Sequence, residues 1–187
     1  MNKVSSYNKW IDVGYELFSE EGHEGIQVER LARITRLNKS GFYHYFGDRF
    51  IFFDHLIQHH LEKAKDFANL TRKLKDFDPS FIQLLLDEKT IVFFEMQLNR
   101  NRNFDSFNKA HVEVSEYMAE AILPIWSEYL DLSPKIAKGY WEFMRDSFNS
   151  RITLKTYSFE FIRNMTAQFR ATVIGSIEKS QEFNPYL

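Results

Sequence analysis

The stretch that decides the fold covers residues 26–53 and reads IQVERLARITRLNKSGFYHYFGDRFIFF. Its apolar residues recur at helical spacing in two short runs, which predicts one helix over residues 28–34 and a second helix beginning at Asn38. Asn38 is a favourable N-cap, and Leu37 before it is placed to pack on Phe42 as a hydrophobic staple. About three residues join the two helices, so the stretch has the dimensions of a helix-turn-helix.

The second of these helices is expected to have two unlike sides. The residues predicted to face inward, on it and on its neighbour, are Val28, Leu31, Ala32, Leu37, Phe42 and Phe46. The residues predicted to face outward are Lys39, Ser40, Gly41, Tyr43 and His44. Side chains of the outward kinds can reach a base edge or a phosphate, and a glycine lets the backbone approach closely.

Charge is segregated around the same stretch. The chain has 24 Lys and Arg against 26 Asp and Glu, a net charge of −2. Residues 10–29 hold six acidic and no basic residues, whereas residues 30–49 hold five basic residues and one acid. A positive patch in a mildly acidic chain is typical of a phosphate-facing element, and equally of one solvated helix face, so charge alone does not separate the two interpretations.

The remaining residues predict further helices and no strand. The expected helices cover residues 6–20, 53–67, 78–98, 107–129, 133–151 and 158–179. Gly22 is expected to close the first of them in a left-handed cap. Pro124 is expected to kink its helix or split it one turn earlier, since proline lacks a backbone donor. The predicted architecture is all-α, with eight or nine helices.

Composition narrows the class of protein. Apolar residues make up 44% and charged residues 27%, as in soluble globular proteins. The absence of cysteine excludes disulfides, thiolate zinc sites and a cysteine nucleophile. No stretch approaches the roughly 18 apolar residues of a membrane helix. A cytoplasmic protein without a membrane partner is therefore expected, and no cofactor is indicated.

Residues 10–53 resemble the DNA-binding domain of the tetracycline-repressor (TetR) family of bacterial regulators. The matching residues are Glu16-Leu17-Phe18 and Gly22, Leu31-Ala32, Asn38 to Phe46, and Asp48-Arg49. Two positions depart from the family pattern. Arg36 stands where a turn glycine is common, and Ile26-Gln27 replaces the usual Thr or Ser cap, at a cost of about 1 kcal/mol in local stability.

The resemblance implies roles for individual residues. Those at base-reading positions are Lys39, Ser40, Gly41 and His44. Those at phosphate-contacting positions are Tyr43, Tyr45 and Arg49, with Gln27 near the start of the first helix of the motif. It further implies a helix-turn-helix domain over residues 1–48 and a helical ligand-binding and dimerisation domain over residues 49–187. A pocket for a small-molecule effector is implied among the later helices, without assigned residues.

The last predicted helix carries a row of small residues spaced by four, namely Ala167, Ala171 and Gly175. Such a row lets two helices approach closely, and the helix over residues 133–151 has apolar residues on two faces. We expect these two helices from each of two chains to form the interface of a homodimer. A two-fold dimer implies a palindromic operator in double-stranded DNA.

Two other classes of protein are alternatives to a DNA-binding repressor released by a ligand. A helical enzyme has candidate bases in His55, His111 and Glu95, but no nucleophile motif, phosphate loop or metal set accompanies them. His55 and His59 have a chelating spacing without a third ligand, and His60 and His111 fit core positions. A ligand-binding or adaptor protein with a non-functional head is the second alternative, because residues 1–50 hold seven basic and seven acidic residues.

Overall fold

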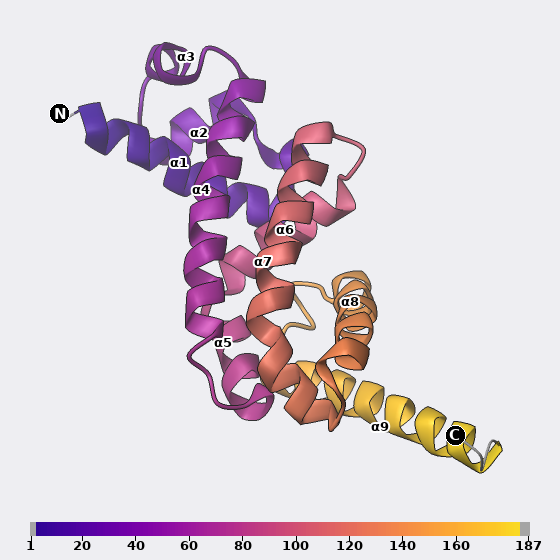
Figure 1. The fold of residues 1–187 in the computed structure, drawn as a ribbon. Helices are drawn as coiled ribbons and strands as arrows, with labels where there is room; N and C mark the ends of the chain where they lie inside the picture. Colours follow the sequence, from indigo (N-terminus) through magenta and orange to yellow (C-terminus); the bar gives the residue numbers. More distant parts are fainter. Residues whose placement is uncertain (1–2, 184–187) are drawn as a thin grey trace. The chain divides into compact units, whose positions relative to one another are not determined.

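The computed structural model describes residues 3–183, with side chains over residues 6–179. In this part of the chain there are nine α-helices, two shorter helical turns and no strand, which confirms the predicted all-α class (Figure 1). None of these helices is long and apolar enough to cross a membrane. Contacts divide the chain into unit 1 (Met1–Asn69 and Glu88–Met118) and unit 2 (Leu70–Asp87 and Ala119–Leu187).

Unit 1 is built on aromatic packing around the first helix. It contains α1 (Lys3–Glu21), the turn η1 (His23–Gly25), α2 (Val28–Thr35), α3 (Lys39–Phe46), nearly all of α4 (Arg49–Thr71), α6 (Lys89–Arg100) and the first half of α7 (Asp105–Leu130). The rings of Tyr15 and Phe18 lie 4.5 and 4.3 Å from the ring of Phe94 on α6. The first helix thus packs directly on α6, and α3 lies at the outer edge of the unit (Figure 1).

Unit 2 has a separate aromatic core. It contains the turn η2 (Phe77–Phe81), α5 (Ile82–Asp87), the end of α7, α8 (Pro134–Arg151) and α9 (Phe159–Phe183). Trp126 of α7 packs between Phe77 and Trp141, at 4.9 and 5.7 Å between ring centroids, and its indole N–H donates to the Ala137 carbonyl. These contacts hold α8 against the end of α7. The predicted functional division after residue 48 is distinct from this division by packing and stays a prediction.

The prediction of a single helix over residues 78–98 is wrong, because this segment forms η2, α5 and α6. Asp78 is extended, as expected before a proline, and Asp76 caps the η2 turn by accepting a hydrogen bond from the Ser80 N–H. A second break falls at Glu88, whose φ of −102° and ψ of 33° are not helical. The segments on either side of Glu88 pack in different units, so tertiary contacts override the continuous helical spacing.

Of the two alternatives expected at Pro124, a kink or a split, the split does not occur, and the cap expected at Gly22 is corrected. α7 is not split at Pro124 but runs from Asp105 to Leu130. Pro124 and Glu120, whose carbonyl loses its helical donor, are exposed, so water can satisfy that carbonyl. Gly22 follows α1 with φ 72° but ψ −165°, which is not the left-handed helical cap expected there. Glycine alone adopts this conformation readily.

Candidate nucleic-acid interface

The helix-turn-helix is formed by α2 and α3. Arg36 ends α2 in the left-handed conformation, with φ 56° and ψ 37°, so a non-glycine residue holds the position where the resemblance leads one to expect glycine. The Leu37 N–H then bonds to the Ala32 carbonyl at 3.2 Å. Asn38 starts α3 as predicted, because its side-chain oxygen accepts from the Ser40 N–H at 3.1 Å. Local bonds therefore fix the turn between the two helices.

The inner side of α3 is anchored by two phenylalanines. Phe42 and Phe46 are 0% and 1% exposed. Phe42 contacts the rings of Trp10 and Phe52 at 5.5 and 5.0 Å, and Phe46 contacts Phe52 at 4.7 Å. Since α1 and α4 both grip this side, α3 has one orientation in the unit, and the opposite side must face outward.

That opposite side carries the predicted DNA-contacting residues of α3. Lys39, Ser40, Tyr43 and His44 are all exposed, Tyr43 by 52%. Tyr45 differs, since it is half-buried with its ring 5.9 Å from that of Tyr7. The structure therefore gathers the base-reading candidates on one open face and places Tyr45 at its margin.

Gly41 lies on α3 at a position where the surrounding protein leaves room for a side chain. Nothing in the described structure lies within 4 Å of the Cβ that any other residue would add there. Glycine inside a helix costs about 0.5–1 kcal/mol relative to alanine. No contact within the described structure requires glycine at this position, as is also true of Gly139 and Gly175.

The two predicted contact residues outside α3 lie at helix starts. Gln27 is the exposed N-cap of α2 and makes no side-chain cap hydrogen bond, in line with the weak cap expected there. Arg49 begins α4, and its guanidinium lies 5.9 and 5.7 Å from the rings of Phe50 and Phe53. Asp48 caps this helix by accepting from the Phe50 and Ile51 N–H groups. The N–H groups at a helix start suit phosphate oxygens, but at α4 the Asp48 carboxylate already accepts from two of them.

Glu29 of α2, which no sequence pattern singled out, lies beside the outer side of α3. Its carboxylate pairs with the Lys39 ammonium at 3.1 Å, and both side chains are exposed. The two residues are ten positions apart on different helices, so no periodicity within one helix signals the contact. The nearby pair of Arg30 and Glu21 joins α2 to α1 in the same way.

Four polar side chains from four helices form a buried network in unit 1. The Tyr15 hydroxyl lies 2.8 Å from His60 Nδ1, His60 Nε2 lies 3.1 Å from Glu95, and His111 Nδ1 bonds to the other carboxylate oxygen. Burial raises the pKa of Tyr15, which keeps its proton for donation to His60. Although burial opposes ionisation of Glu95, hydrogen bonds from His111 and His60 prevail and lower its pKa. His60 and His111 are therefore satisfied core histidines, as their positions predict.

The other histidines considered as ligands lie in aromatic surroundings. His55 Nδ1 is 3.0 Å from the Tyr7 hydroxyl, and the His59 ring lies 5.1 Å from the Tyr15 ring, edge to face. Burial is the main cause that lowers the pKa of His59. Among the described residues, no group of three His, Cys, Asp or Glu side chains is arranged to hold a metal ion.

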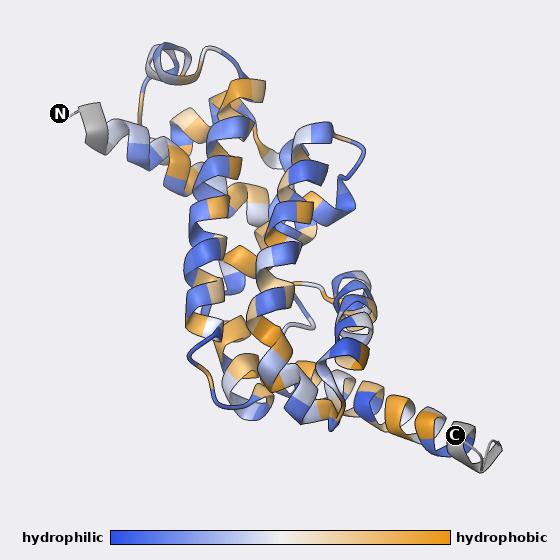
Figure 2. Cartoon of the chain, viewed as in Figure 1, coloured by the Kyte–Doolittle hydropathy of each residue, from blue (hydrophilic) through white to orange (hydrophobic). Residues whose placement is uncertain are grey.

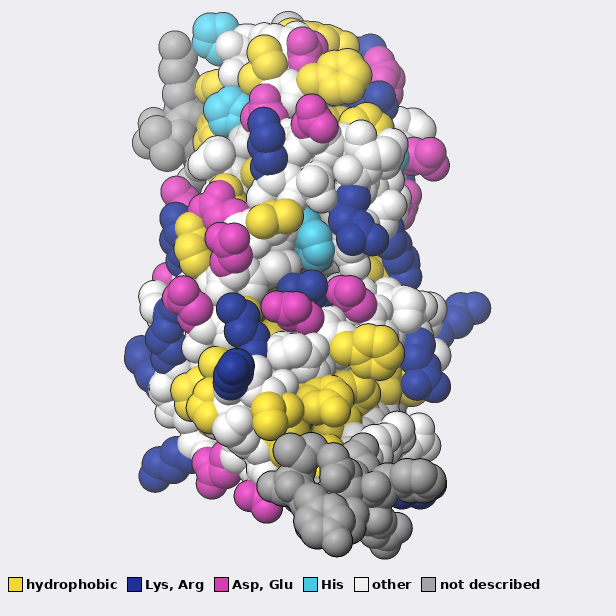
Figure 3. Space-filling view, turned by 45° about the vertical axis from the view of Figure 1, so that its right-hand side comes forward, with side chains coloured by type: hydrophobic (Ala, Val, Ile, Leu, Met, Phe, Trp, Pro, Cys, Tyr) yellow, Lys and Arg dark blue, Asp and Glu magenta, His cyan; other side chains and the backbone are white. Residues whose placement is uncertain are grey.

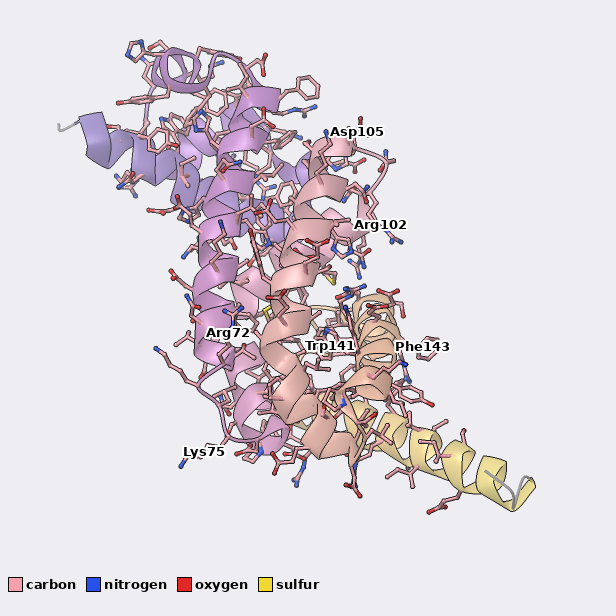
Figure 4. All side chains as sticks on the ribbon, in the orientation of Figure 1. Arg72, Lys75, Arg102, Asp105, Trp141 and Phe143 are labelled. Carbon is pink, nitrogen blue, oxygen red and sulfur yellow. The ribbon has the colours of Figure 1, made fainter. Side chains whose placement is uncertain are left out.

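A groove between α8 and α9 lies in unit 2. It has a volume of about 670 Å³, and its lining includes Ile136, Phe143 and Phe169. Ile136 and Phe143 are 52% and 67% exposed, and Phe143 points away from α8 while Trp141 points inward (Figure 4). Apolar side chains gather in the lower part of the face shown in Figure 3, and the ribbon of α9 alternates between hydrophobic and hydrophilic residues in Figure 2. The groove is thus a large apolar surface open to solvent.

The predicted interface residues lie beside this groove rather than in it. Ala167 and Ala171 are exposed and Gly175 is half-buried, each one position before a groove residue of α9. Within the described structure, nothing lies within 4 Å of a Cβ added at Gly175. In the part of the chain that the structure describes, Ala167 and Ala171 are therefore open to solvent, and Gly175 has room for a side chain.

Comparison with known proteins agrees with this geometry. Residues 11–50 match the family model of the bacterial regulatory proteins of the tetR family. A transcriptional regulator (TerR/AcrR family) from Aquifex aeolicus VF5 is 17% identical over 90% of this chain and 97% of that one, with a TM-score of 0.62. A Rhodococcus sp. protein assigned to the TetR-family transcriptional regulators is 14% identical over 92% and 96%, with a TM-score of 0.54. No curated protein matches the chain in sequence. Residues 11–50 thus match the tetR-family model, and the chain as a whole has the fold of these two solved structures.

Proposed function

We propose that this protein represses transcription by binding a palindromic operator as a homodimer, from which a small-molecule ligand releases it. The observation that carries the proposal is the outer side of α3, where exposed polar side chains surround a glycine that has no internal role. Phosphate contacts from Arg49, Tyr43, Tyr45 and Gln27 would supply most of the affinity and its salt dependence. Lys39, Ser40, Gly41 and His44 would supply discrimination between base sequences.

Selection of bound fragments from random-sequence DNA tests this proposal. We expect an enriched inverted repeat whose half-sites are centred one helical turn apart, about 34–36 Å. The affinity for the selected sequence should fall steeply as salt rises, because bound counterions are released from the phosphates. Failure to enrich any sequence, together with weak retention on DNA at low salt, would contradict the proposal.

The dimer part of the proposal is supported by α8 and α9. Phe143 and Ile136 expose apolar surface beside a groove, and Ala167, Ala171 and Gly175 offer a close approach for a second helix. We expect Ala171→Glu to give monomers in sedimentation velocity, since a long charged side chain blocks that approach. The control Leu154→Glu places the same charge on an exposed apolar residue of the α8–α9 connection and should remain dimeric. A dimer unchanged by Ala171→Glu would remove the row of small residues from the interface.

Release by a ligand would act through the distance between the two DNA-binding heads. A ligand lowers operator affinity only if it binds better to a state in which that distance fits the operator poorly. α4 is the natural lever, because it begins at Arg49 beside the interface and extends for 23 residues. Compounds that raise the melting temperature should also lower the affinity for the selected operator. Stabilising compounds that leave operator affinity unchanged would argue against release.

One observation favours the alternative of an adaptor protein with a non-functional head. The cations of Lys39 and Arg30 are both paired with carboxylates, which reduces the positive potential of the head. Retention on a DNA column separates the two functions. A regulator should elute at a salt concentration that depends on DNA sequence, whereas an adaptor should pass through at every concentration.

A further inference from the structure

Glu29 of α2 forms an ion pair with Lys39 of α3, the helix that is proposed to contact the bases of DNA. Its carboxylate lies 3.1 Å from the Lys39 ammonium, and the two side chains are 71% and 52% exposed. Lys39 is the first residue of α3, and Glu29 is the second residue of α2. The first turns of both helices therefore meet at this pair, on the face that α1 and α4 leave open.

A docking that places Lys39 at base edges brings Glu29 to the same groove. The ion pair sets the carboxylate within one side-chain length of whatever the ammonium touches. Near phosphates a carboxylate is repelled, and the paired Lys39 ammonium offsets that repulsion only while it stays on Glu29 and is not engaged by a base. The hydrogen bond from its own backbone N–H, and then Lys39, lower the pKa of Glu29, which keeps it ionised at neutral pH.

The neighbouring acids on the head have other structural tasks. The Asp48 carboxylate accepts hydrogen bonds from the Phe50 and Ile51 N–H groups at the start of α4, at 2.7 and 2.9 Å. Glu21 forms two hydrogen bonds with the Arg30 guanidinium and joins α1 to α2. Glu29 differs from both, because the side chain that it pairs with is itself a predicted base-reading residue.

The chemistry of the major groove limits what a carboxylate can bind there. Guanine offers only acceptors, and thymine offers an acceptor and a methyl group, so neither suits an anion. Adenine has an amino donor beside the N7 acceptor, whereas cytosine presents its N4 amino group with no acceptor of its own at that edge. A lysine prefers the opposite partner, the O6 and N7 acceptors of guanine.

From this complementarity, and resting on the proposed function, we propose that Glu29 is a specificity-determining residue that accepts a hydrogen bond from the N4 amino group of a cytosine. Lys39 donates to a guanine in the same half-site. Glu29 and Lys39 thus recognise a cytosine amino donor next to a guanine acceptor. On other sequences the two side chains stay paired with each other, and their charges neutralise one another. Each half-site therefore contains a cytosine whose replacement weakens binding by about 5- to 150-fold.

The experiment compares the sequences selected from random DNA by four forms of the full-length protein. These are the unchanged protein, Glu29→Ala, Glu29→Gln and the control Glu24→Gln, which removes the same charge from the exposed turn before α2. Glu29→Ala should lose the preference at one cytosine position and keep the rest of the motif. Glu29→Gln should change that preference to adenine, since glutamine pairs with adenine N6 and N7. Glu24→Gln should select the original motif.

The outcomes separate this inference from the proposed function. If the unchanged protein selects a motif and both Glu29 variants select the same one, Glu29 reads no base and the inference is overturned. If the unchanged protein selects nothing, the proposed function fails and the inference fails with it. An acid in the first turn also stabilises a helix, so thermal unfolding of each variant is measured. A purely structural role would weaken binding to every sequence equally, and that result would also overturn the inference.

Discussion

Replacement of Gly41 by alanine or leucine should raise the stability of the protein and lower its affinity for DNA. Gly41 lies in α3, and an added Cβ would meet nothing within 4 Å in the described structure. Alanine there removes a helix cost of about 0.5–1 kcal/mol. For a chain of 187 residues this should raise the melting temperature by about 1–4 °C. Leucine has a helix propensity close to that of alanine and should stabilise similarly.

The same substitutions should weaken binding to the selected operator. In the proposed docking of α3 against DNA, a methyl group at residue 41 would occupy part of the space between the α3 backbone and the bases, and a leucine side chain would occupy more of it. Loss of one good contact in the groove is worth about 1–3 kcal/mol, so Gly41→Leu should weaken binding by about 5- to 150-fold. The affinity is measured by fluorescence anisotropy of a labelled operator, and stability by calorimetry on the same preparations.

A matched control is available at Gly14 of α1. A Cβ there would lie 2.4 Å from the Phe52 ring, so Gly14→Ala should destabilise the protein by about 1–3 kcal/mol through overpacking. Two results would refute the reasoning about Gly41. Undiminished operator affinity of Gly41→Leu would show that α3 does not approach DNA closely. A lower melting temperature of Gly41→Ala would show that the site is not open.

Two further predictions concern recognition and acid stability. Lys39→Ala should relax the preference for particular DNA sequences. Arg49→Ala should instead weaken binding to every sequence and reduce the slope of log affinity against log salt concentration by about 1. Equal losses of affinity on all sequences for Lys39→Ala would contradict its base-reading role. For the buried network, the pKa of Glu95 is lowered on folding, so its ionisation stabilises the fold above the unfolded pKa and that contribution is lost as pH falls through the folded value. Glu95→Gln should therefore cost about 1–3 kcal/mol near neutral pH in urea unfolding, and the difference should shrink below about pH 5. A difference that stays constant down to acid pH would show that the charge of Glu95 is not what stabilises the network.

The local parts of this structure could be predicted from the sequence because interactions between near neighbours decide them. Asn38 caps α3 through the N–H two residues later, and Phe42 and Phe46 share one side of that helix because they are four apart. Ser133-Pro134 begins α8 for a similarly local reason. The spacing of His60 and His111 among apolar residues likewise indicated that both are buried.

Only the tertiary structure decided the features that join distant segments. Apolar residues recur at helical spacing from residue 82 to residue 98. The helix is nevertheless interrupted at Glu88, because α5 and α6 pack in different units. The partners of Glu95 lie 35 and 16 residues away, and Glu29 meets Lys39 across two helices. Periodicity shows which side of a helix is apolar, but it carries no information about which other helix covers that side. The packing of α2 and α3 that places the Glu29 carboxylate beside Lys39 therefore depends on contacts between distant segments, which no local pattern predicts.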